Sequence, residues 1–317
     1  MRSTVSPAVL TVAAALLLAG CSGGSTAHRL GPAPAVDIGL VPTPTDAGSL
    51  RLPLQEYLPG EGELEQLNRA QRVLTDQCMT RYGFRYRLPE VPPAPAVGNT
   101  RRYGLADPVA AAASGYGTYG TDGGTRAPRP EMDPTEQLVL GGEDGTRPGE
   151  LPGSQAEVEK SGKDAGRVNG LPVPPGGCTR EAYLKLWVPT ADAPDPLEVQ
   201  ELDAQAYDRS RREVRVNLAT EKWQECMARK GYQAKNPVSP MPELGLRPET
   251  FTGPEGIGAA TADVACKRET NLVGIWFAVE SAYQRELIEE HGELLRSSRR
   301  QLDDSLRLAA GLVAASG

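Results

Sequence analysis

The amino-acid sequence predicts a mainly α-helical protein: a disulfide-stapled helical bundle with a long C-terminal helix and extended Pro/Gly-rich irregular connectors. Three observations support this prediction. Apolar side chains recur at helical spacing over residues 60–82 and again over residues 196–308. Matching cysteine-containing motifs occupy residues 78–84 and 226–232. Gly (35) and Pro (28) together make up 63 of the 317 residues, which implies long irregular stretches.

The first twenty residues have the pattern of a bacterial lipoprotein signal. Residues 8–18 form an apolar run that is too short to span a bilayer and suits a signal peptide. The run leads into Leu18-Ala19-Gly20-Cys21, which matches the L-[AS]-[GA]-C pattern of bacterial lipoproteins. In that family the cysteine receives a diacylglycerol, the chain is cut before it, and the new amine is acylated with a fatty acid such as palmitate. The alternative is an ordinary secretory signal whose cleavage site contains a cysteine.

The lipoprotein pattern predicts a location and an anchor. Residues 1–20 are expected to be removed, and Cys21 is expected to carry the lipid on the extracytoplasmic face of the cell membrane. Residues 21–59 are predicted to be a lipid-anchored flexible tether, because residues 22–49 have no helical or strand period. Two or three acyl chains anchor a protein stably, whereas one does not.

The charge balance argues against a nucleic-acid partner. The formal net charge is −7, and removal of residues 1–20, whose only charged residue is Arg2, makes it −8. Nucleic-acid-binding proteins are typically basic. The expected partners are membrane lipid, through acylated Cys21, and an envelope protein or a cell-wall polymer.

Two internal repeats organise the chain into a first helical half (60–190) and a second (191–317). Residues 78–84 read C-M-T-R-Y-G-F and residues 226–232 read C-M-A-R-K-G-Y. A glycine just past a helix end accepts the left-handed conformation, and the aromatic residue after it packs back on the helix, here on the Met. Each motif therefore predicts a helix end.

The second repeat suggests how the cysteines pair. Residues 178–181 read C-T-R-E and residues 266–269 read C-K-R-E, so each half has one Cys near a helix end and one predicted to open a new helix. Four cysteines besides the anchor allow three pairings. An exported location permits disulfides, and the alternative is four reduced, buried thiols. The repeat favours two pairs: Cys78–Cys178 and Cys226–Cys266.

The first half contains an irregular excursion over residues 88–177. A short helix is predicted over residues 107–113. Tyr103, Tyr116 and Tyr119 form either a sugar-stacking surface or a set of side chains that pin the loop to a core. A loop this long is usually functional or disordered, so a partner site is expected in it.

The second half is predicted to contain two long helices. The first runs from about Pro196 to Lys230 and carries a cluster of four arginines, which form a solvated face or contact lipid phosphate. The last runs without proline from Cys266 through Leu308, about 45 residues and roughly 65 Å at 1.5 Å per residue. A capping-box pattern at residues 252–255 precedes it, with firm helix from about Thr261. The four arginines are Arg209, Arg211, Arg212 and Arg215.

No catalytic residues, metal ligands or cofactor are predicted. Four glutamates surround His291, but di-metal sites on helices use Glu-x-x-His, and Ile288 stands where that Glu would be. The only other histidine, His28, lies in the predicted tether, which leaves no second imidazole for a typical zinc site. The glutamates are therefore read as a solvated acidic face: Glu286, Glu289, Glu290 and Glu293.

Three stretches resemble uncharacterised lipoproteins of actinobacteria, over much of residues 60–310. They are W-x-x-C-M-x-x-x-G-Y over residues 223–232, A-D-V-A-C over residues 262–266, and P-x-G-G-C-x-x-E-A over residues 174–182. The resemblance implies an exported, disulfide-bonded protein. No activity is assigned to the group, so the resemblance implies nothing about a mechanism.

These observations predict a non-catalytic interaction module at the cell envelope. The long last helix motivates this prediction, because it is longer than a small helical bundle and its far end would pack on a partner or fray. The alternative is an envelope hydrolase that acts on cell-wall glycan through carboxylates, which have no fixed sequence spacing. A solute-binding protein would need alternating strands and helices, which the sequence does not show.

Overall fold

The structure is a computed structural model that describes residues 36–85, 99–117, 131–143 and 147–316. The predicted signal peptide, Cys21 and Tyr119 lie outside these residues. The described chain from Val36 onward forms one compact unit. It is mainly helical, as the sequence predicts, with two disulfides and a long C-terminal helix.

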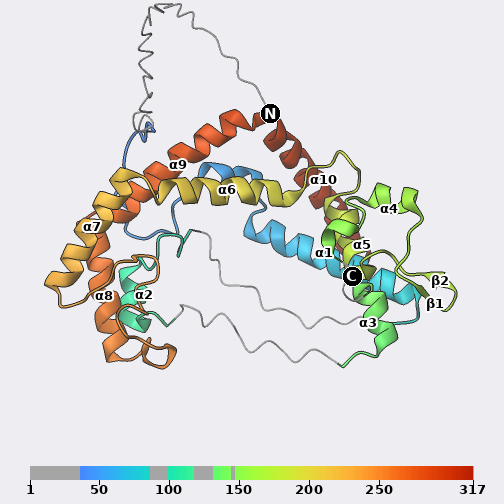
Figure 1. The fold of residues 1–317 in the computed structure, drawn as a ribbon, viewed down its shortest axis with the longest axis horizontal. Helices are drawn as coiled ribbons and strands as arrows, with labels where there is room; N and C mark the ends of the chain where they lie inside the picture. Colours follow the sequence, from blue (N-terminus) through green and yellow to red (C-terminus); the bar gives the residue numbers. More distant parts are fainter. Residues whose placement is uncertain (1–35, 86–98, 118–130, 144–146, 317) are drawn as a thin grey trace, which may run out of the picture. The chain divides into compact units, whose positions relative to one another are not determined.

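The described residues contain ten α-helices, three short 3-10 helices and one two-stranded hairpin (Figure 1). The hairpin pairs β1 (Arg167–Val168) with β2 (Leu171–Pro172) in antiparallel register. The 3-10 helices are η1 (Pro53–Tyr57), η2 (Pro148–Glu150) and η3 (Pro248–Thr250). The α-helices are α1 (Glu61–Arg81), α2 (Pro108–Ser114), α3 (Pro134–Gly141), α4 (Gln155–Ser161), α5 (Gly177–Trp187), α6 (Pro196–Ser210), α7 (Val214–Arg229), α8 (Pro254–Glu269), α9 (Leu272–Glu290) and α10 (Gly292–Ser316).

The two predicted halves pack against each other through the last helix. Helix α10, from the second half, packs on α1 and α5 of the first half. Their contact buries Leu67 of α1, Leu186 of α5 and Leu302 of α10 in one apolar cluster. The last helix of the second half therefore covers the first helix of the first half.

A second packing layer surrounds the tryptophans of the C-terminal half. Helix α9 packs on α6 and α7, and α8 packs on α2 and α7. Trp223 of α7 is fully buried in this cluster, and Trp276 of α9 is 5% exposed. The Trp276 ring stacks on Tyr207 of α6 with 5.6 Å between ring centroids. These large side chains form the centre of the apolar cluster between the helices.

The two long predicted helices are broken, and the breaks have polar causes. The helix expected over residues 196–230 divides into α6 and α7, because the Ser210 hydroxyl turns back to the Tyr207 carbonyl (2.7 Å) and Glu213 caps the start of α7. The 45-residue helix divides twice. Asn271 adopts a left-handed conformation (φ 50°) and ends α8, and the chain breaks again at His291 before Gly292. Helix α10 alone is 25 residues long.

The described part of the predicted tether, residues 36–59, is not a flexible spacer. Leu52 and Leu54 are buried, and η1 packs on α9 and α10. The Leu54 N–H donates to Gln284 Oε1 (2.8 Å), and Asn99 Nδ2 donates to the Leu50 carbonyl (2.9 Å). Side chains of other elements satisfy its backbone groups, so the segment is ordered without a helical or strand period in its sequence.

The described part of the excursion 88–177 is also more ordered than the sequence suggests. It holds α2, α3, α4 and the hairpin, and α2 begins at the Asp107 cap as predicted. Tyr103 and Tyr116 are fully buried, so these two tyrosines pin the loop and do not form a sugar-stacking surface. The many Pro and Gly residues of this stretch hide its helices, because each helix is only seven or eight residues long.

Helix α8 begins earlier than expected, at Pro254 rather than near Thr261. Its cap is Gly253 without a side-chain hydrogen bond, so the predicted capping box does not form. Gly256, which weakens a helix in isolation, is needed for close packing, because a Cβ at this position would lie 2.3 Å from the Phe251 carbonyl oxygen.

Candidate functional site

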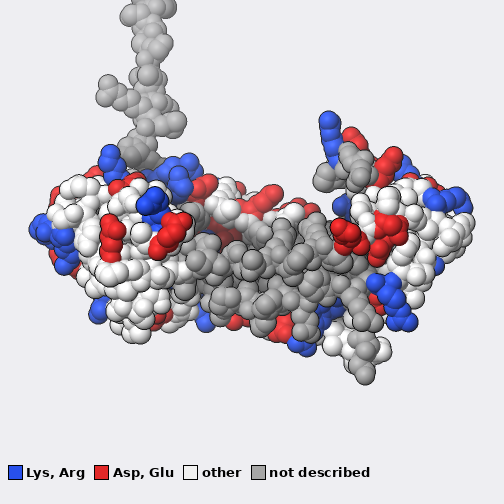
Figure 2. Space-filling model, turned by 90° about the horizontal axis from the view of Figure 1, so that it is seen from below, with Lys and Arg blue, Asp and Glu red and all other residues white. Residues whose placement is uncertain are grey.

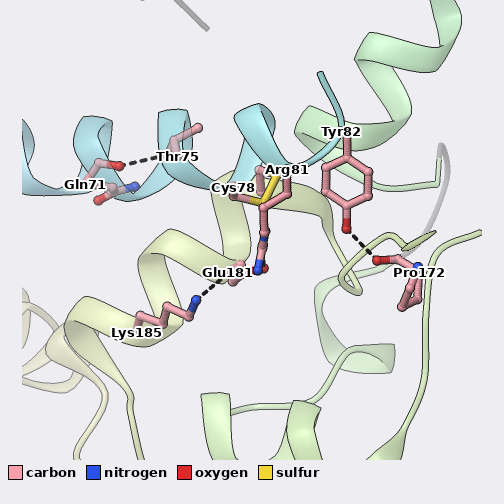
Figure 3. Close-up of a disulfide and its surroundings, with 9 residues drawn as sticks. Gln71, Thr75, Cys78, Arg81, Tyr82, Pro172, Glu181 and Lys185 are labelled. Carbon is pink, nitrogen blue, oxygen red and sulfur yellow. Dashed lines mark hydrogen bonds and ion pairs between the residues drawn. A yellow bond between two sulfur atoms is a disulfide. The ribbon is translucent and has the colours of Figure 1, made fainter. Parts of the chain in front are cut away.

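The first disulfide unit joins the end of α1 to the start of α5 (Figure 3). Cys78 and Cys178 form a disulfide with Cα atoms 5.5 Å apart. Helix α1 ends as the motif predicts. Gly83 has a φ of 87°, and the Phe84 N–H donates to the Met79 carbonyl at 3.1 Å. This is the Schellman motif, in which the chain turns back over the last helical turn.

An ion-pair cluster lies beside this disulfide. Glu181 of α5 is 9% exposed and binds both Arg81 of α1 and Lys185 of α5. Its Oε2 lies 3.6 Å from the Cys78 sulfur. Beyond it, the Tyr82 hydroxyl donates to the Pro172 carbonyl of the hairpin (Figure 3). Disulfide, ion pairs and hydrogen bond thus fasten three elements at one point.

The second disulfide unit repeats this arrangement between α7 and α8. Cys226 and Cys266 form a disulfide with Cα atoms 5.6 Å apart, and Gly231 has a φ of 86°. The Tyr232 N–H donates to the Met227 carbonyl at 3.0 Å. The pairing and both helix ends predicted from the repeats are confirmed.

The arginine and glutamate of the repeats also correspond. Arg229 of α7 pairs with Glu269 of α8 (2.6 Å), as Arg81 pairs with Glu181 in the first unit. Each basic residue lies three positions after its cysteine, and so does each acidic one, which places the ion pair one turn from the disulfide. The two units differ in burial, since the Glu269 side chain is 55% exposed. The second unit also differs from the prediction, because Cys266 lies in the last turn of α8 and does not open a helix.

Asp263 and Lys267 form a buried ion pair that the sequence patterns did not predict. Both side chains are essentially inaccessible, and Lys267 Nζ lies 3.1 Å from Asp263 Oδ2. The carboxylate also accepts from Trp223 Nε1 (2.9 Å) and from the Tyr116 hydroxyl (3.2 Å). The ammonium donates to the Leu105 carbonyl (2.9 Å). Burial raises the pKa of Asp263 and lowers that of Lys267, and each partner opposes the shift of the other.

A second buried cluster centres on Glu280 of α9. Its side chain is fully buried, and Oε2 accepts from the Tyr103 hydroxyl at 2.9 Å. Arg102 binds Oε1 and reaches Asp203 of α6 at 3.0 Å. Burial raises the pKa of the Glu280 carboxyl, and the Arg102 guanidinium opposes that change. Gln284 joins the cluster by donating to Asp203 Oδ1 at 2.8 Å.

The two buried clusters have a structural role. Together they attach residues 99–107 to three helices, α6, α8 and α9. The sequence contains a usable signal for them. Asp263 and Lys267 stand four residues apart within an alanine-rich helical run, and Glu280 interrupts an apolar stripe. Charged residues are almost never fully buried unless they are paired.

One hollow in the described residues is an open groove lined by four carboxylates, hereafter the acidic groove. Its volume is about 450 Å³, and it lies between the start of α4, residues 188–195, the start of α6 and α10. Asp195 is already used as the cap of α6, where it accepts from the Leu197 N–H at 2.9 Å. A hydrogen bond from Thr190 lowers the pKa of exposed Asp192. The four carboxylates are those of Glu157, Asp192, Asp195 and Glu198.

On the face drawn in Figure 2, Lys and Arg are interspersed with Asp and Glu. Glu286, Glu289, Glu290 and Glu293 are exposed near His291, in agreement with the predicted solvated face. Within the described ranges, no group of His, Cys, Asp and Glu side chains is arranged to hold a metal ion.

The lipid-attachment residue Cys21 lies outside the described residues. No helix in the part of the chain that the structure describes combines the length and apolar character needed to cross a membrane. No protein-family model, no curated protein and no solved structure matches the chain.

Proposed function

We propose that the protein is a membrane-anchored extracytoplasmic lipoprotein that acts as a non-catalytic interaction module at the cell envelope. Acylated Cys21 would attach it to membrane lipid. The observation that carries the proposal is the pair of disulfides, Cys78–Cys178 and Cys226–Cys266, each built by the same motif. Such bonds persist in oxidising, exported locations, which is where the signal in residues 1–20 would deliver the chain.

The acidic groove is the surface that we propose for partner binding. Asp192 and Glu198 are exposed along it, and the hydrogen bond from Thr190 that lowers the pKa of Asp192 favours its charged form. Oppositely charged surfaces steer encounter and select partners. The groove therefore suits a cationic segment of an envelope protein or an amine-bearing wall polymer.

Cross-linking mass spectrometry on intact cells, with digestion under non-reducing conditions, tests this function. We expect a recurrent partner linked to peptides of α4, α6 or α10. The groove variant Asp192→Asn/Glu198→Gln should lose that partner. The control variant Glu221→Gln/Glu225→Gln removes two exposed carboxylates from α7 and should keep it. Internal cross-links alone, in the wild type, would contradict the proposal.

The acidic groove also favours a second candidate, an envelope hydrolase that acts on wall glycan through two carboxylates. A general acid for this chemistry needs a raised pKa, and Asp192 has a lowered one, so Asp192 could serve only as base or nucleophile. Turnover of wall fragments by the purified protein, abolished by Asp192→Asn, would support this candidate. Absence of turnover would count against the hydrolase and favour the non-catalytic interaction module.

A further inference from the structure

We propose that the junction between α6 and α7 is a docking surface for an anionic phospholipid membrane, which orients the anchored protein on the bilayer. The inference rests on the proposed lipid attachment at Cys21. It adds a second membrane contact, made by residues 209–218 and hereafter called the basic junction.

The basic junction is a local positive region in an acidic chain. Residues 207–215 contain four arginines and two acidic residues, against a net charge of −7 for the whole sequence. Arg211 and Arg212 are both exposed, and Arg211 faces only a loose pairing with Asp208 at 3.8 Å. One of the acids, Glu213, is buried and already bound to Arg215 at 2.8 Å. The arginines at the surface therefore remain available to lipid phosphates.

Exposed aliphatic side chains follow directly on α7. Val214 is 59% exposed and Leu218 is 50% exposed, one helical turn apart on the same face. Basic residues beside exposed aliphatic ones are the composition of protein surfaces that rest at the interface of a bilayer. A face that contacts only water would have no need of exposed Val214 and Leu218.

The path of the chain brings this surface towards the anchor. Arg215 Nη2 donates to the Val36 carbonyl (2.9 Å), so the described chain starts at the beginning of α7. Asn271 Nδ2 holds the Pro42 carbonyl (3.0 Å), and between these two fixed points Leu40 is 98% exposed. Cys21 precedes Val36 by 15 residues, which span at most about 50 Å when fully extended. A lipid on Cys21 therefore keeps the basic junction within reach of the membrane.

Vesicle flotation of the mature chain carrying Cys21→Ser tests the surface without the lipid. The vesicles are phosphatidylcholine with about one third phosphatidylglycerol, and a second set is phosphatidylcholine alone. We expect binding to the anionic vesicles at low salt, loss of binding at high salt, and little binding to the neutral set. Each arginine near an anionic surface contributes about fivefold in affinity, so Arg211→Ala/Arg212→Ala should bind about 25-fold more weakly.

The matched control is Arg296→Ala/Arg300→Ala, which removes two exposed arginines from α10. It should bind within about twofold of the parent, and circular dichroism checks that all variants stay folded. Three results would overturn the proposal: no flotation of the parent, unchanged binding of the junction variant, or an equal loss in the control. The mass of Cys21 in the wild-type protein from cells reports lipid attachment separately, so failure of the anchor and failure of the surface are distinguishable.

Discussion

Replacing Lys267 with Met should destabilise the protein strongly, because it leaves Asp263 charged and buried. Both side chains are inaccessible, and the carboxylate would keep only its hydrogen bonds from Trp223 and Tyr116. Removing one partner of a buried pair costs about 3–5 kcal/mol. That is a large part of the 5–15 kcal/mol by which folded proteins are typically stable.

The double variant Asp263→Asn/Lys267→Met should recover part of this loss. Asn keeps an acceptor for Trp223, and the main remaining defect is the Leu105 carbonyl without its donor, about 1–3 kcal/mol. Urea unfolding without reductant, followed by circular dichroism and tryptophan fluorescence, measures both changes. A loss below about 1 kcal/mol for Lys267→Met, or a double variant no more stable than the single one, would refute this reasoning.

The same variant should change the pH dependence of unfolding. Burial raises the pKa of Asp263, and Lys267 is the strongest group that lowers it. Without Lys267, the folded state binds a proton that the unfolded state does not bind between pH 4 and the raised pKa. The free energy of unfolding of Lys267→Met should therefore be larger near pH 5 than near pH 7.5. An unchanged profile would show that the carboxylate is solvated.

Three further predictions use urea unfolding. Glu181→Gln should cost about 1.5–3 kcal/mol and Glu269→Gln less than about 1 kcal/mol, because only the first carboxylate is buried; equal losses would contradict the assigned burial. Gly256→Ala should destabilise α8, whereas Gly311→Ala, with open space around it, should stabilise α10 by about 0.5–1 kcal/mol; the reverse order would contradict the packing. The stability of the wild type relative to Glu280→Gln should fall as pH rises from about 4.5 through the raised pKa of Glu280; a rise would contradict the sign of that shift.

The disulfides and helix ends were predictable because they depend on short local patterns. A Cys one turn before a Gly and an aromatic residue specifies a helix end, and the repetition of the motif specifies which cysteines correspond. The first unit follows this logic from Cys78 to Phe84, and the second from Cys226 to Tyr232. Neither prediction required knowledge of the tertiary fold.

The helix breaks and the packed segment 36–59 were not predictable in the same way. At the break after α6, the Ser210 hydroxyl also accepts from Trp276 Nε1 at 2.9 Å, a partner 66 residues away. The break at Asn271 coincides with its hydrogen bond to Pro42. Residues 36–59 are ordered by partners more than 40 positions distant, so a search for local periodicity finds nothing in them.

The acidic groove was not predicted from the sequence, because its residues are also far apart in the chain. Its carboxylates come from α4, from residues 192 and 195, and from α6, and only the fold brings them together. No spacing rule connects Glu157 with Glu198. The basic junction, in contrast, is a run of neighbouring residues, so the sequence alone identified its arginines as a surface feature.

The mass of the intact protein, extracted from membranes without reduction, tests the central claim most directly. We expect a chain that begins at Cys21, carries a diacylglycerol and a fatty acid, and lacks the four hydrogens lost when two disulfides form. A chain that retains residues 1–20, an unmodified Cys21, or four free thiols would contradict the account of an exported, lipid-anchored protein.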